Sequence, residues 1–119
     1  MRNVILWAAM LFCLPAQAQE WSKADKALFA TSSVLLATDW AQTRYIAKHS
    51  DIYHENNVLL GKHPAVGTVN AYFAGTLVAN YLLMDYLSPE NRKYFQYVLI
   101  GVEGTAVAHN AHIGIKLDF

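Results

Sequence analysis

The side chains best suited to chemistry lie in a polar connector near the middle of the chain, between residues 53 and 64. The connector contains His54, Glu55, Asn57 and His63, whose nitrogen and oxygen atoms can bind a ligand or exchange a proton. Segments that join rigid elements often carry function, because the scaffold folds without them. We therefore predict that this connector forms part of a functional site.

Two further carboxylates lie within apolar segments on either side of the connector. Asp39 follows an uncharged run, and Glu103 is the only charged residue of the last apolar segment. A carboxylate in such surroundings must be paired, protonated or in contact with water. We expect Asp39, Glu103 and Asn110 to cluster, joined by Asn70 or Asn80. The cluster would serve either as polar contact between helices or as a proton or ligand site.

Other polar residues near Asp39 form a stripe. Asp39 and Thr43 share one helical face, with Gln42 beside them and Arg44 just beyond. The stripe can be a face exposed to water or lipid headgroups, or it can hold a functional carboxylate inside a membrane. Both interpretations stay open.

The histidines offer weak candidates for a metal site. His109 and His112 are three residues apart, and His54 beside Glu55 could supply further ligands. The sequence has no HExxH motif, no paired cysteines, no phosphate-binding glycine loop and no Ser-His-Asp spacing. We predict no metal, no cofactor and no nameable catalytic residue, and an enzyme is the less favoured class.

Helices must position these side chains. Residues 19–50 carry apolar residues at spacings of three and four, and Ser22 or Asp25 can cap their start. Residues 66–87 follow as a second helix. The two helices flank the connector, so it must fold at one end of the pair.

A third helix begins at Ser88, Pro89 and Glu90, which suit the N-cap, the first helical position and the acidic first turn. Its apolar segment extends through residues 93–116. The link to the preceding helix is therefore short. A short link predicts that the second and third helices are antiparallel neighbours.

Composition favours a membrane protein. Of 119 residues, 55% are hydrophobic and 15% charged, and the formal net charge is zero, which is more apolar and less charged than a typical soluble domain. Residues 63–84 contain no Lys, Arg, Asp or Glu, so we predict a transmembrane helix at Val66–Leu87. Basic residues are scattered, which argues against nucleic acid as a partner.

The second helix also carries small residues at a regular spacing of four. Ala71, Gly75 and Ala79 are four residues apart, which lets a neighbouring helix or a second copy approach closely. Asn70 and Asn80 would then find partners across the contact. We expect this ladder to pack against the adjacent helix.

The N-terminus is typical of an exported protein. A basic residue precedes the apolar run Val4–Leu14, and the Ala-Gln-Ala at residues 16–18 fits cleavage after Ala18. The alternative is an uncleaved anchor, for which the run is short. Cys13, the only cysteine, lies in this segment, so the mature chain would have no thiol.

The chain ends in residues 113–119, where apolar residues alternate with polar or small ones as in the last strand of a membrane barrel. The preceding residues lack the repeated alternation of a closed barrel. The prediction is an all-α fold: a signal peptide at residues 1–18, then a single helical membrane domain at 19–119 of about three helices, with a short extended tail.

Several motifs resemble a family of small exported membrane proteins of bacteria and their phages, whose function is uncharacterised. The matching runs are Asp39–Ala47, Tyr53–Pro64 with its Glu-x-Asn-x-x-Leu-Gly pattern, Val69–Phe73, Arg92–Tyr97, Glu103 and Ile113–Phe119. Val58 stands where the family pattern has proline, which makes the turn less rigid here. The resemblance implies a multi-helix envelope protein and supplies no catalytic residue.

These observations predict a non-enzymatic integral protein of the bacterial inner membrane. In this interpretation it modulates another envelope component, and the resemblance adds a phage or prophage product that affects infection or lysis. Its partners would be membrane lipid, another envelope protein, or a second copy bound through Ala71, Gly75 and Ala79. The alternatives are a membrane-embedded metal- or carboxylate-dependent enzyme and a periplasmic helical binding module.

Overall fold

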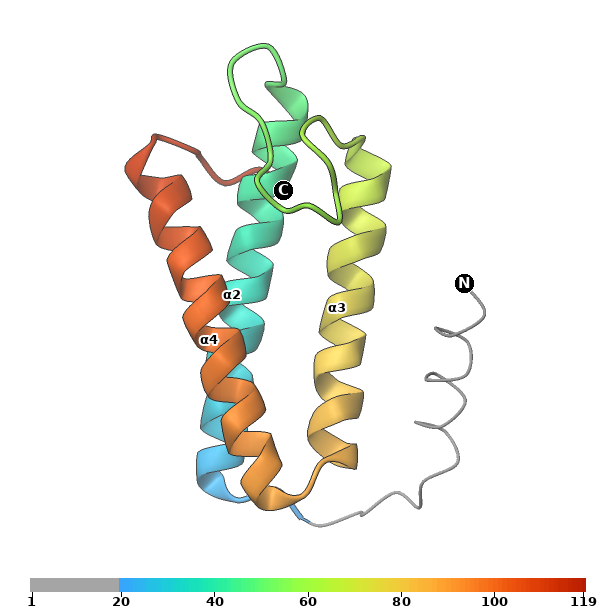
Figure 1. The fold of residues 1–119 in the computed structure, drawn as a ribbon, viewed down its shortest axis with the longest axis vertical. Coiled ribbons are helices and arrows are strands. Elements are labelled where there is room, and N and C mark those ends of the chain that lie inside the picture. Colours follow the sequence, from blue (N-terminus) through green and yellow to red (C-terminus); the bar gives the residue numbers. More distant parts are fainter. Residues whose placement is uncertain (1–19) are drawn as a thin grey trace.

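The computed structural model describes residues 20–119, which form three α-helices and, within this range, no strand (Figure 1). The helices are α2 (Lys23–Lys48), α3 (Val66–Tyr86) and α4 (Pro89–His112). The prediction of an all-α fold with three helices is confirmed. The predicted signal peptide, its cleavage site and Cys13 lie outside the described residues.

The helix starts follow the local rules. At α2 the Ser22 hydroxyl accepts the Asp25 N–H at 3.0 Å and the Asp25 carboxylate accepts the Ser22 N–H at 3.0 Å, so both candidate caps act together in a capping box. At α4 the Ser88 hydroxyl accepts the Asn91 N–H at 3.4 Å, with proline next in the chain. With Ser22 and Ser88 as N-caps, α2 begins at Lys23 and α4 at Pro89, as the capping residues predicted.

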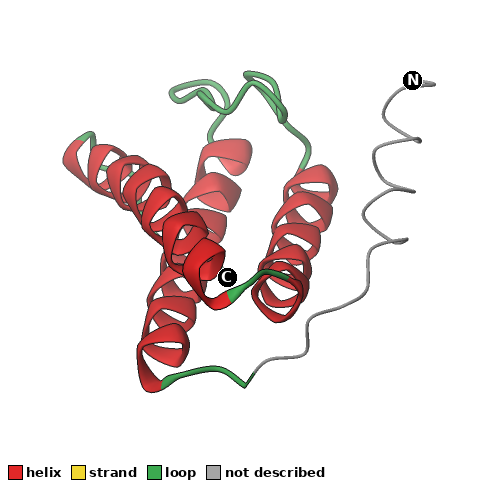
Figure 2. Cartoon of the chain, turned by 60° about the horizontal axis from the view of Figure 1, so that its bottom comes forward, coloured by secondary structure: helices red, strands yellow, loops and turns green. Residues whose placement is uncertain are grey.

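α2 is the central helix of the bundle. It packs against both α3 and α4, while α3 and α4 diverge from their short link (Figures 1 and 2). The predicted side-by-side packing of α3 and α4 is therefore wrong, although they are antiparallel. The link fixes only their joined ends, and contacts with α2 determine where the rest of each helix lies.

The small-residue ladder faces outward. Ala71, Gly75 and Ala79 are exposed, and a Cβ placed on Gly75 would meet nothing within 4 Å. The prediction that this ladder packs against the adjacent helix is wrong. α3 instead turns Val69 and Phe73 toward α2, because larger side chains fill the space that the crossing leaves.

Neither α3 nor any other helix of residues 20–119 is long and apolar enough, by its average hydropathy, to cross a membrane. The predicted span at Val66–Leu87 is a helix almost throughout, but freedom from charge does not make it strongly apolar. Asn70, Asn80 and three tyrosines lower its average.

Burial in this bundle follows an unusual pattern. The fully enclosed apolar group is small and centres on Leu36, Val69 and Phe73. Among the described residues, the nine buried polar or charged ones outnumber the seven buried hydrophobic ones: Asp25, Ser32, Asp39, Gln42, Thr43, Asn80, Arg92, Gln96 and Asn110. Large apolar side chains stand outside instead, among them Val98 at 66% and Val78 at 59% exposed. Soluble domains bury such side chains and expose the polar ones.

The connector and the tail close one end of the bundle. The connector folds into the space between the diverging helices (Figure 1), and Glu55 N–H donates to the Lys62 carbonyl at 2.8 Å across its loop. After α4, Gly114 takes a positive φ of 91°, which lets the chain reverse. The tail then lies on α2, where Asp118 N–H donates to the Ala41 carbonyl at 3.0 Å. The short non-helical tail is confirmed.

Candidate carboxylate pocket

A pocket of about 440 Å³ lies where the connector meets the diverging helices. It receives Asp39 from α2, Tyr72 from α3, Glu103 from α4 and Glu55 from the connector. Its other lining residues are Asn56, Asn57, Val58, Val102, Ala106, His109 and Asn110. The connector and the two isolated carboxylates, far apart in sequence, thus meet at one place.

Asp39 and Glu103 form the centre of this pocket. Both line it, and Asp39 is only 8% exposed. Two carboxylates enclosed in one place repel each other unless a proton or a cation lies between them. The centre of the pocket is therefore strongly acidic.

Amides and a hydroxyl surround the pair. The Thr43 hydroxyl donates to Asp39 Oδ1 at 3.2 Å, and Asn110 Nδ2 lies 3.5 Å from the same oxygen. Asn110 also donates to Gln42 Oε1 at 3.2 Å. The predicted cluster of Asp39, Glu103 and Asn110 is present, and the stripe on α2 is buried rather than exposed to water or headgroups.

The two other asparagines lie elsewhere, although both find partners across helix contacts as expected. Asn70 Oδ1 accepts from Trp40 at 2.9 Å and from Arg44 at 2.7 Å. Asn80 Nδ2 donates to the Ser32 hydroxyl at 2.9 Å. Neither one joins the carboxylate pair.

Glu55 and Asn57 fix the connector over the pocket. Glu55 Oε1 accepts the backbone N–H groups of Asn56 at 3.1 Å and Asn57 at 3.0 Å, while its Oε2 is buried without a hydrogen-bond partner. Asn57 Nδ2 donates to the Tyr72 hydroxyl at 3.0 Å, which ties the loop to α3. Glu55 also interacts electrostatically with Glu103, so three carboxyl groups share one region.

The charge of the pocket is unbalanced. None of its lining residues in the described chain is Lys or Arg, and Glu103 Oε2 is buried without a hydrogen-bond donor. Three carboxyl groups, Asp39, Glu103 and Glu55, therefore share the pocket without a Lys or Arg beside them. Such a site favours a proton or a cation over an anion.

The remaining predicted site residues are dispersed. His54 lines a separate small hollow within the connector, and His63 and His112 are exposed. His109 does line the carboxylate pocket. Within residues 20–119 no group of three or more His, Cys, Asp and Glu side chains is arranged to hold a metal ion.

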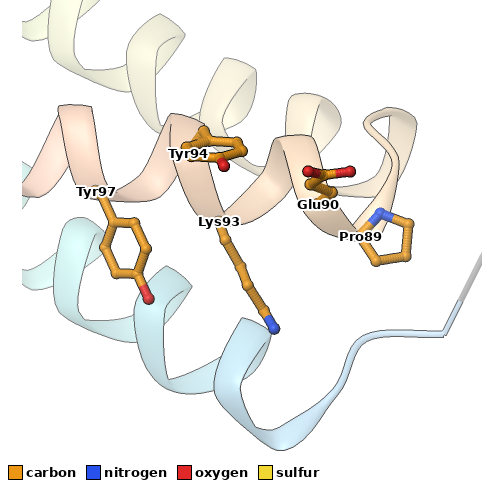
Figure 3. Close-up of a pocket in the computed structure, with 5 residues that line it drawn as sticks. All are labelled: Pro89, Glu90, Lys93, Tyr94 and Tyr97. Carbon is orange, nitrogen blue, oxygen red and sulfur yellow. The ribbon is translucent and has the colours of Figure 1, made fainter.

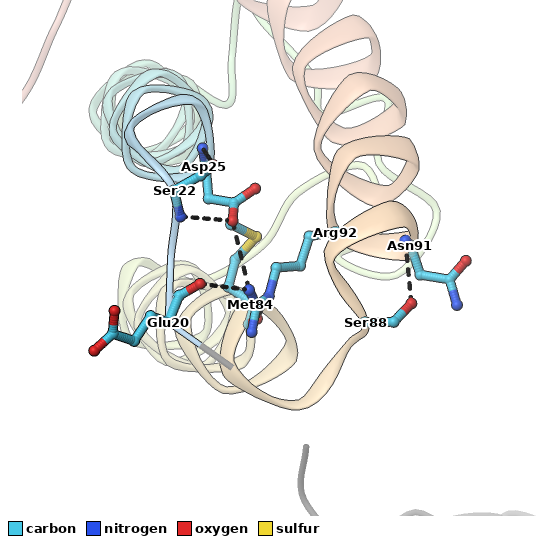
Figure 4. A network of polar contacts seen from close by, with 7 residues as sticks. All are labelled: Glu20, Ser22, Asp25, Met84, Ser88, Asn91 and Arg92. Carbon is cyan, nitrogen blue, oxygen red and sulfur yellow. Dashed lines mark hydrogen bonds and ion pairs between the residues drawn. The ribbon is translucent and has the colours of Figure 1, made fainter. Parts of the chain in front are cut away.

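Sequence reasoning missed a second polar cluster at the opposite end of the bundle (Figure 4). Arg92 of α4 is 0% exposed and Asp25 of α2 is 2% exposed, and their side chains approach to 3.5 Å. Arg92 also donates to the backbone carbonyls of Met84 and Glu20. No spacing rule links residues so far apart, so the pair could be found only from the packing of α4 on α2.

Next to this ion pair lies a chain of neutral hydrogen bonds. Gln96 Nε2 donates to Asn80 Oδ1 at 2.8 Å, and Asn80 Nδ2 donates to the Ser32 hydroxyl. All three residues are at most 2% exposed. The chain links α4, α3 and α2 at one level.

The tail is held by charge. Arg44 Nε lies 3.4 Å and Lys48 Nζ 2.9 Å from Asp118 Oδ2. The hydrogen bond from the Lys48 ammonium holds the pKa of Asp118 below its ordinary value of 3.8, and Arg44 adds to the effect. Asp118 is therefore ionised at neutral pH and anchors the tail to α2.

Comparison with known proteins identifies no relative. No protein-family model matches the sequence, and neither a curated protein nor a solved structure matches it significantly. The contacts described above therefore carry the functional inference.

Proposed function

We propose that this protein is a small, non-enzymatic membrane protein of the bacterial envelope, embedded as a bundle with its polar side chains turned inward. One observation carries the proposal. Exposed charged side chains on the three described helices occur only near helix ends: Lys23, Lys26 and Lys48 on α2, Asp85 on α3, and Glu90 and Lys93 on α4. The outward faces between these ends are uncharged.

Those faces carry an apolar belt, which we define as Val34, Val78, Leu82, Val98 and Val102. Each of these side chains is more than half exposed. The belt draws on all three helices, and small residues such as Ala71 and Gly75 fill the surface between its members. A surface of this kind suits hydrocarbon and is costly in water.

The inward faces account for the modest hydropathy of each helix. Polar residues such as Asn80, Gln96 and Asp39 lower the average over a helix, yet they bond to one another inside the bundle. Buried polar residues that pair across helices are typical of membrane bundles. Hydropathy averaged around a helix does not separate its two faces.

The end of the bundle near the α3–α4 link has the composition of a membrane interface. A hollow of about 390 Å³ there is lined by Pro89, Glu90, Lys93, Tyr94 and Tyr97 (Figure 3). The two tyrosine rings and Lys93 project from α4, next to the belt residue Val98. Tyrosine and lysine are enriched where a membrane meets water.

The opposite end supports an interaction role. There the connector and tail present exposed polar and apolar side chains, including Lys62, Val58 and Phe119. We propose that this end contacts another envelope component. The resemblance to exported bacterial and phage proteins agrees with this role and motivates the prediction of a phage or prophage product that affects infection or lysis.

A pair of lysine variants tests membrane embedding. Val98→Lys adds a charge in the belt, whereas Asn91→Lys adds the same charge to an exposed position at the end of α4. In a membrane the first should cost roughly 2.5–3.5 kcal/mol at the helix centre and the second little. Wild-type protein should resist alkaline carbonate extraction, and Val98→Lys should lower the inserted amount. Release of wild type into the soluble fraction, with equal yields of both variants, would refute the proposal.

The carboxylate pocket favours one second candidate, a carboxylate-dependent enzyme within the membrane. A protonated and an ionised carboxyl group side by side can act as acid and base. Asp39→Asn and Glu103→Gln would then abolish the cellular effect of the protein at unchanged level. Under the non-enzymatic proposal, changes in the exposed connector residues Lys62 and Leu59, which do not line the pocket, should weaken the cellular effect more.

A further inference from the structure

We infer that the face of α2 bearing Trp40, Arg44 and Lys48 is a recognition site for an extended peptide segment in which a carboxylate precedes an aromatic residue. The chain's own tail, residues 113–119, occupies this site as an internal ligand, and a partner segment of the same chemistry binds by displacing it. The inference names a site for the interaction role proposed for this end of the bundle. It does not depend on membrane embedding, because it rests on contacts of the tail with α2 and of α2 with α3.

The first observation is that α2 contacts every polar group of one tail residue, Asp118. The backbone N–H of Asp118 donates to the Ala41 carbonyl at 3.0 Å, and its backbone carbonyl accepts from Arg44 Nε at 3.1 Å. Its carboxylate lies 3.4 Å from Arg44 Nε and 2.9 Å from Lys48 Nζ. Proteins that bind short extended segments combine main-chain hydrogen bonds with side-chain recognition in this way.

The next tail residue, Phe119, adds an aromatic contact. Its ring meets the Trp40 indole edge to face, with ring centroids 6.2 Å apart. Trp40, Arg44 and Lys48 are spaced four residues apart along α2, so they share one face of the helix. This face therefore binds a carboxylate and an aromatic ring on consecutive residues.

α3 holds the site in place through contacts that do not involve the tail. Asn70 Oδ1 accepts from Arg44 Nη1 at 2.7 Å and from Trp40 Nε1 at 2.9 Å. Trp40 also stacks on Phe73, with ring centroids 6.4 Å apart. One end of the guanidinium is thus fixed by α3, while its Nε faces the tail. Groups that are already oriented lose little freedom when a ligand binds.

The far part of the tail is held mainly through Asp118. Ile115 is 6% exposed and anchors the near part, just after the chain reversal. Beyond it, Leu117 is 63% exposed, and Phe119 is 80% exposed despite its contact with Trp40. Residues 116–119 therefore bury little apolar surface, and a segment that offers the same polar contacts can replace them.

Charge favours an acidic partner segment. Arg44 and Lys48 supply two positive charges, and the Asp118 carboxylate balances one of them. A tethered tail competes at an effective concentration on the order of 1 mM, so a partner must make stronger contacts than the tail makes. A second carboxylate beside the first would do so, because it would use the remaining positive charge.

A fluorescently labelled peptide with the sequence of residues 113–119 tests the site. Its end is amidated, so that Asp118 supplies its only carboxylate. In the full-length Asp118→Lys variant the introduced cation is repelled by Arg44 and Lys48, which drives the chain's own tail from the site. The peptide should bind this variant at least about ten-fold more tightly than wild type, where the tethered tail competes. Fluorescence polarisation measures both affinities.

Matched changes in the Asp118→Lys background identify the groups that bind the peptide. Arg44→Met should weaken peptide binding at least about ten-fold, because it removes hydrogen bonds to a charged group. Lys26→Met, which changes an exposed residue near the start of α2, should leave it unchanged. The peptide carrying Asp118→Asn should bind several-fold more weakly than the original peptide. If Arg44→Met fails to fold, the exposed Lys48→Met replaces it.

Three results would overturn the inference: equal peptide binding to wild type and Asp118→Lys, no binding to either, or binding that does not depend on the carboxylate of the peptide. A wild-type dimer that Asp118→Lys converts to a monomer would overturn it as well, because the tail of a second copy would then fill the site. Each of these results leaves the carbonate-extraction test of membrane embedding unaffected.

Discussion

The two ends of the bundle bury charge in different ways. Near the α3–α4 link, the carboxylate of Asp25 faces the guanidinium of Arg92, and both are enclosed. Near the connector, Asp39, Glu103 and Glu55 share a pocket that no Lys or Arg of the described residues lines. The first arrangement neutralises its charge internally, whereas the second does not.

This difference separates polar contacts that hold the fold together from polar groups that remain available for function. Arg92 also bonds to the carbonyls of Met84 and Glu20, so it joins three segments of the chain. Buried oxygens without a donor occur at both ends, on Asp25 and Gln96 as on Glu103 and Glu55, so the two ends differ in the buried cation and not in unpaired oxygens. Substitutions at the two ends should therefore have opposite consequences.

The largest effect is expected from Arg92→Met. It leaves the Asp25 carboxylate buried without its cation, and breaking a buried pair in this way typically costs about 3–5 kcal/mol. Unfolding by denaturant in detergent measures the loss. Lys93→Met, one residue away and exposed, is the matched control and should change stability little. A stable Arg92→Met protein would remove the distinction between the two ends.

A smaller effect is expected from Asn80→Ala. This change leaves Gln96 Nε2 and the Ser32 hydroxyl without their partner at Asn80, and a buried group without a partner costs about 1–3 kcal/mol. The double variant Asn80→Leu with Gln96→Leu removes both groups of that bond and should recover part of the loss. If the double variant loses more stability than its two single variants do together, this chain of hydrogen bonds is not a simple structural contact.

Glu103→Gln should scarcely change stability, by less than about 1 kcal/mol, because the amide can donate a hydrogen bond to Asp39 and a partly buried acid is removed. If the carboxylate-dependent alternative holds, its effect should appear in function, as loss of the cellular activity at unchanged protein level. Thermal unfolding and a phenotypic assay measure the two quantities. A large loss of stability, with activity retained among the molecules that fold, would show that the carboxylate pocket serves the structure, as the Asp25–Arg92 pair does.

The smallest effect concerns the tail. Because ion pairing lowers the pKa of Asp118, its contribution is present at neutral pH and is lost as the pH falls below its ordinary value of 3.8. The indole N–H resonance of Trp40, which lies beside the tail residue Phe119, should shift in that range. Asp118→Asn should abolish the shift, while Asp51→Asn, in the exposed turn after α2, should preserve it.

Local sequence rules predicted the helices well. Ser22, Asp25, Ser88 and Pro89 act where capping chemistry places them, because the contacts involved span only a few residues. The cluster of Asp39, Glu103 and Asn110 was also predictable, since buried polar groups in apolar segments must find one another. The sequence also suggested that the connector forms part of a site. It did not show that Glu55 lines the same pocket as Asp39 and Glu103.

The failures concern contacts between distant elements. Two features depend on how whole helices pack, which no short motif encodes. One is that the α3 face with Gly75 points outward, and the other is the central position of α2. Arg92 illustrates the same limit, because it reads as an ordinary basic residue at the start of a helix. Its burial follows from the crossing of α4 over α2 and from the partner, Asp25, that α2 supplies there.

Cysteine accessibility in native membranes tests most directly whether the outer faces of the bundle contact lipid. In a Cys13→Ser background, Val78→Cys lies in the apolar belt and Lys62→Cys in the exposed connector. The membrane proposal predicts that a water-soluble maleimide labels Lys62→Cys quickly and labels Val78→Cys only after the membrane is dissolved and the protein unfolded. Equal labelling of both positions in intact membranes would contradict it.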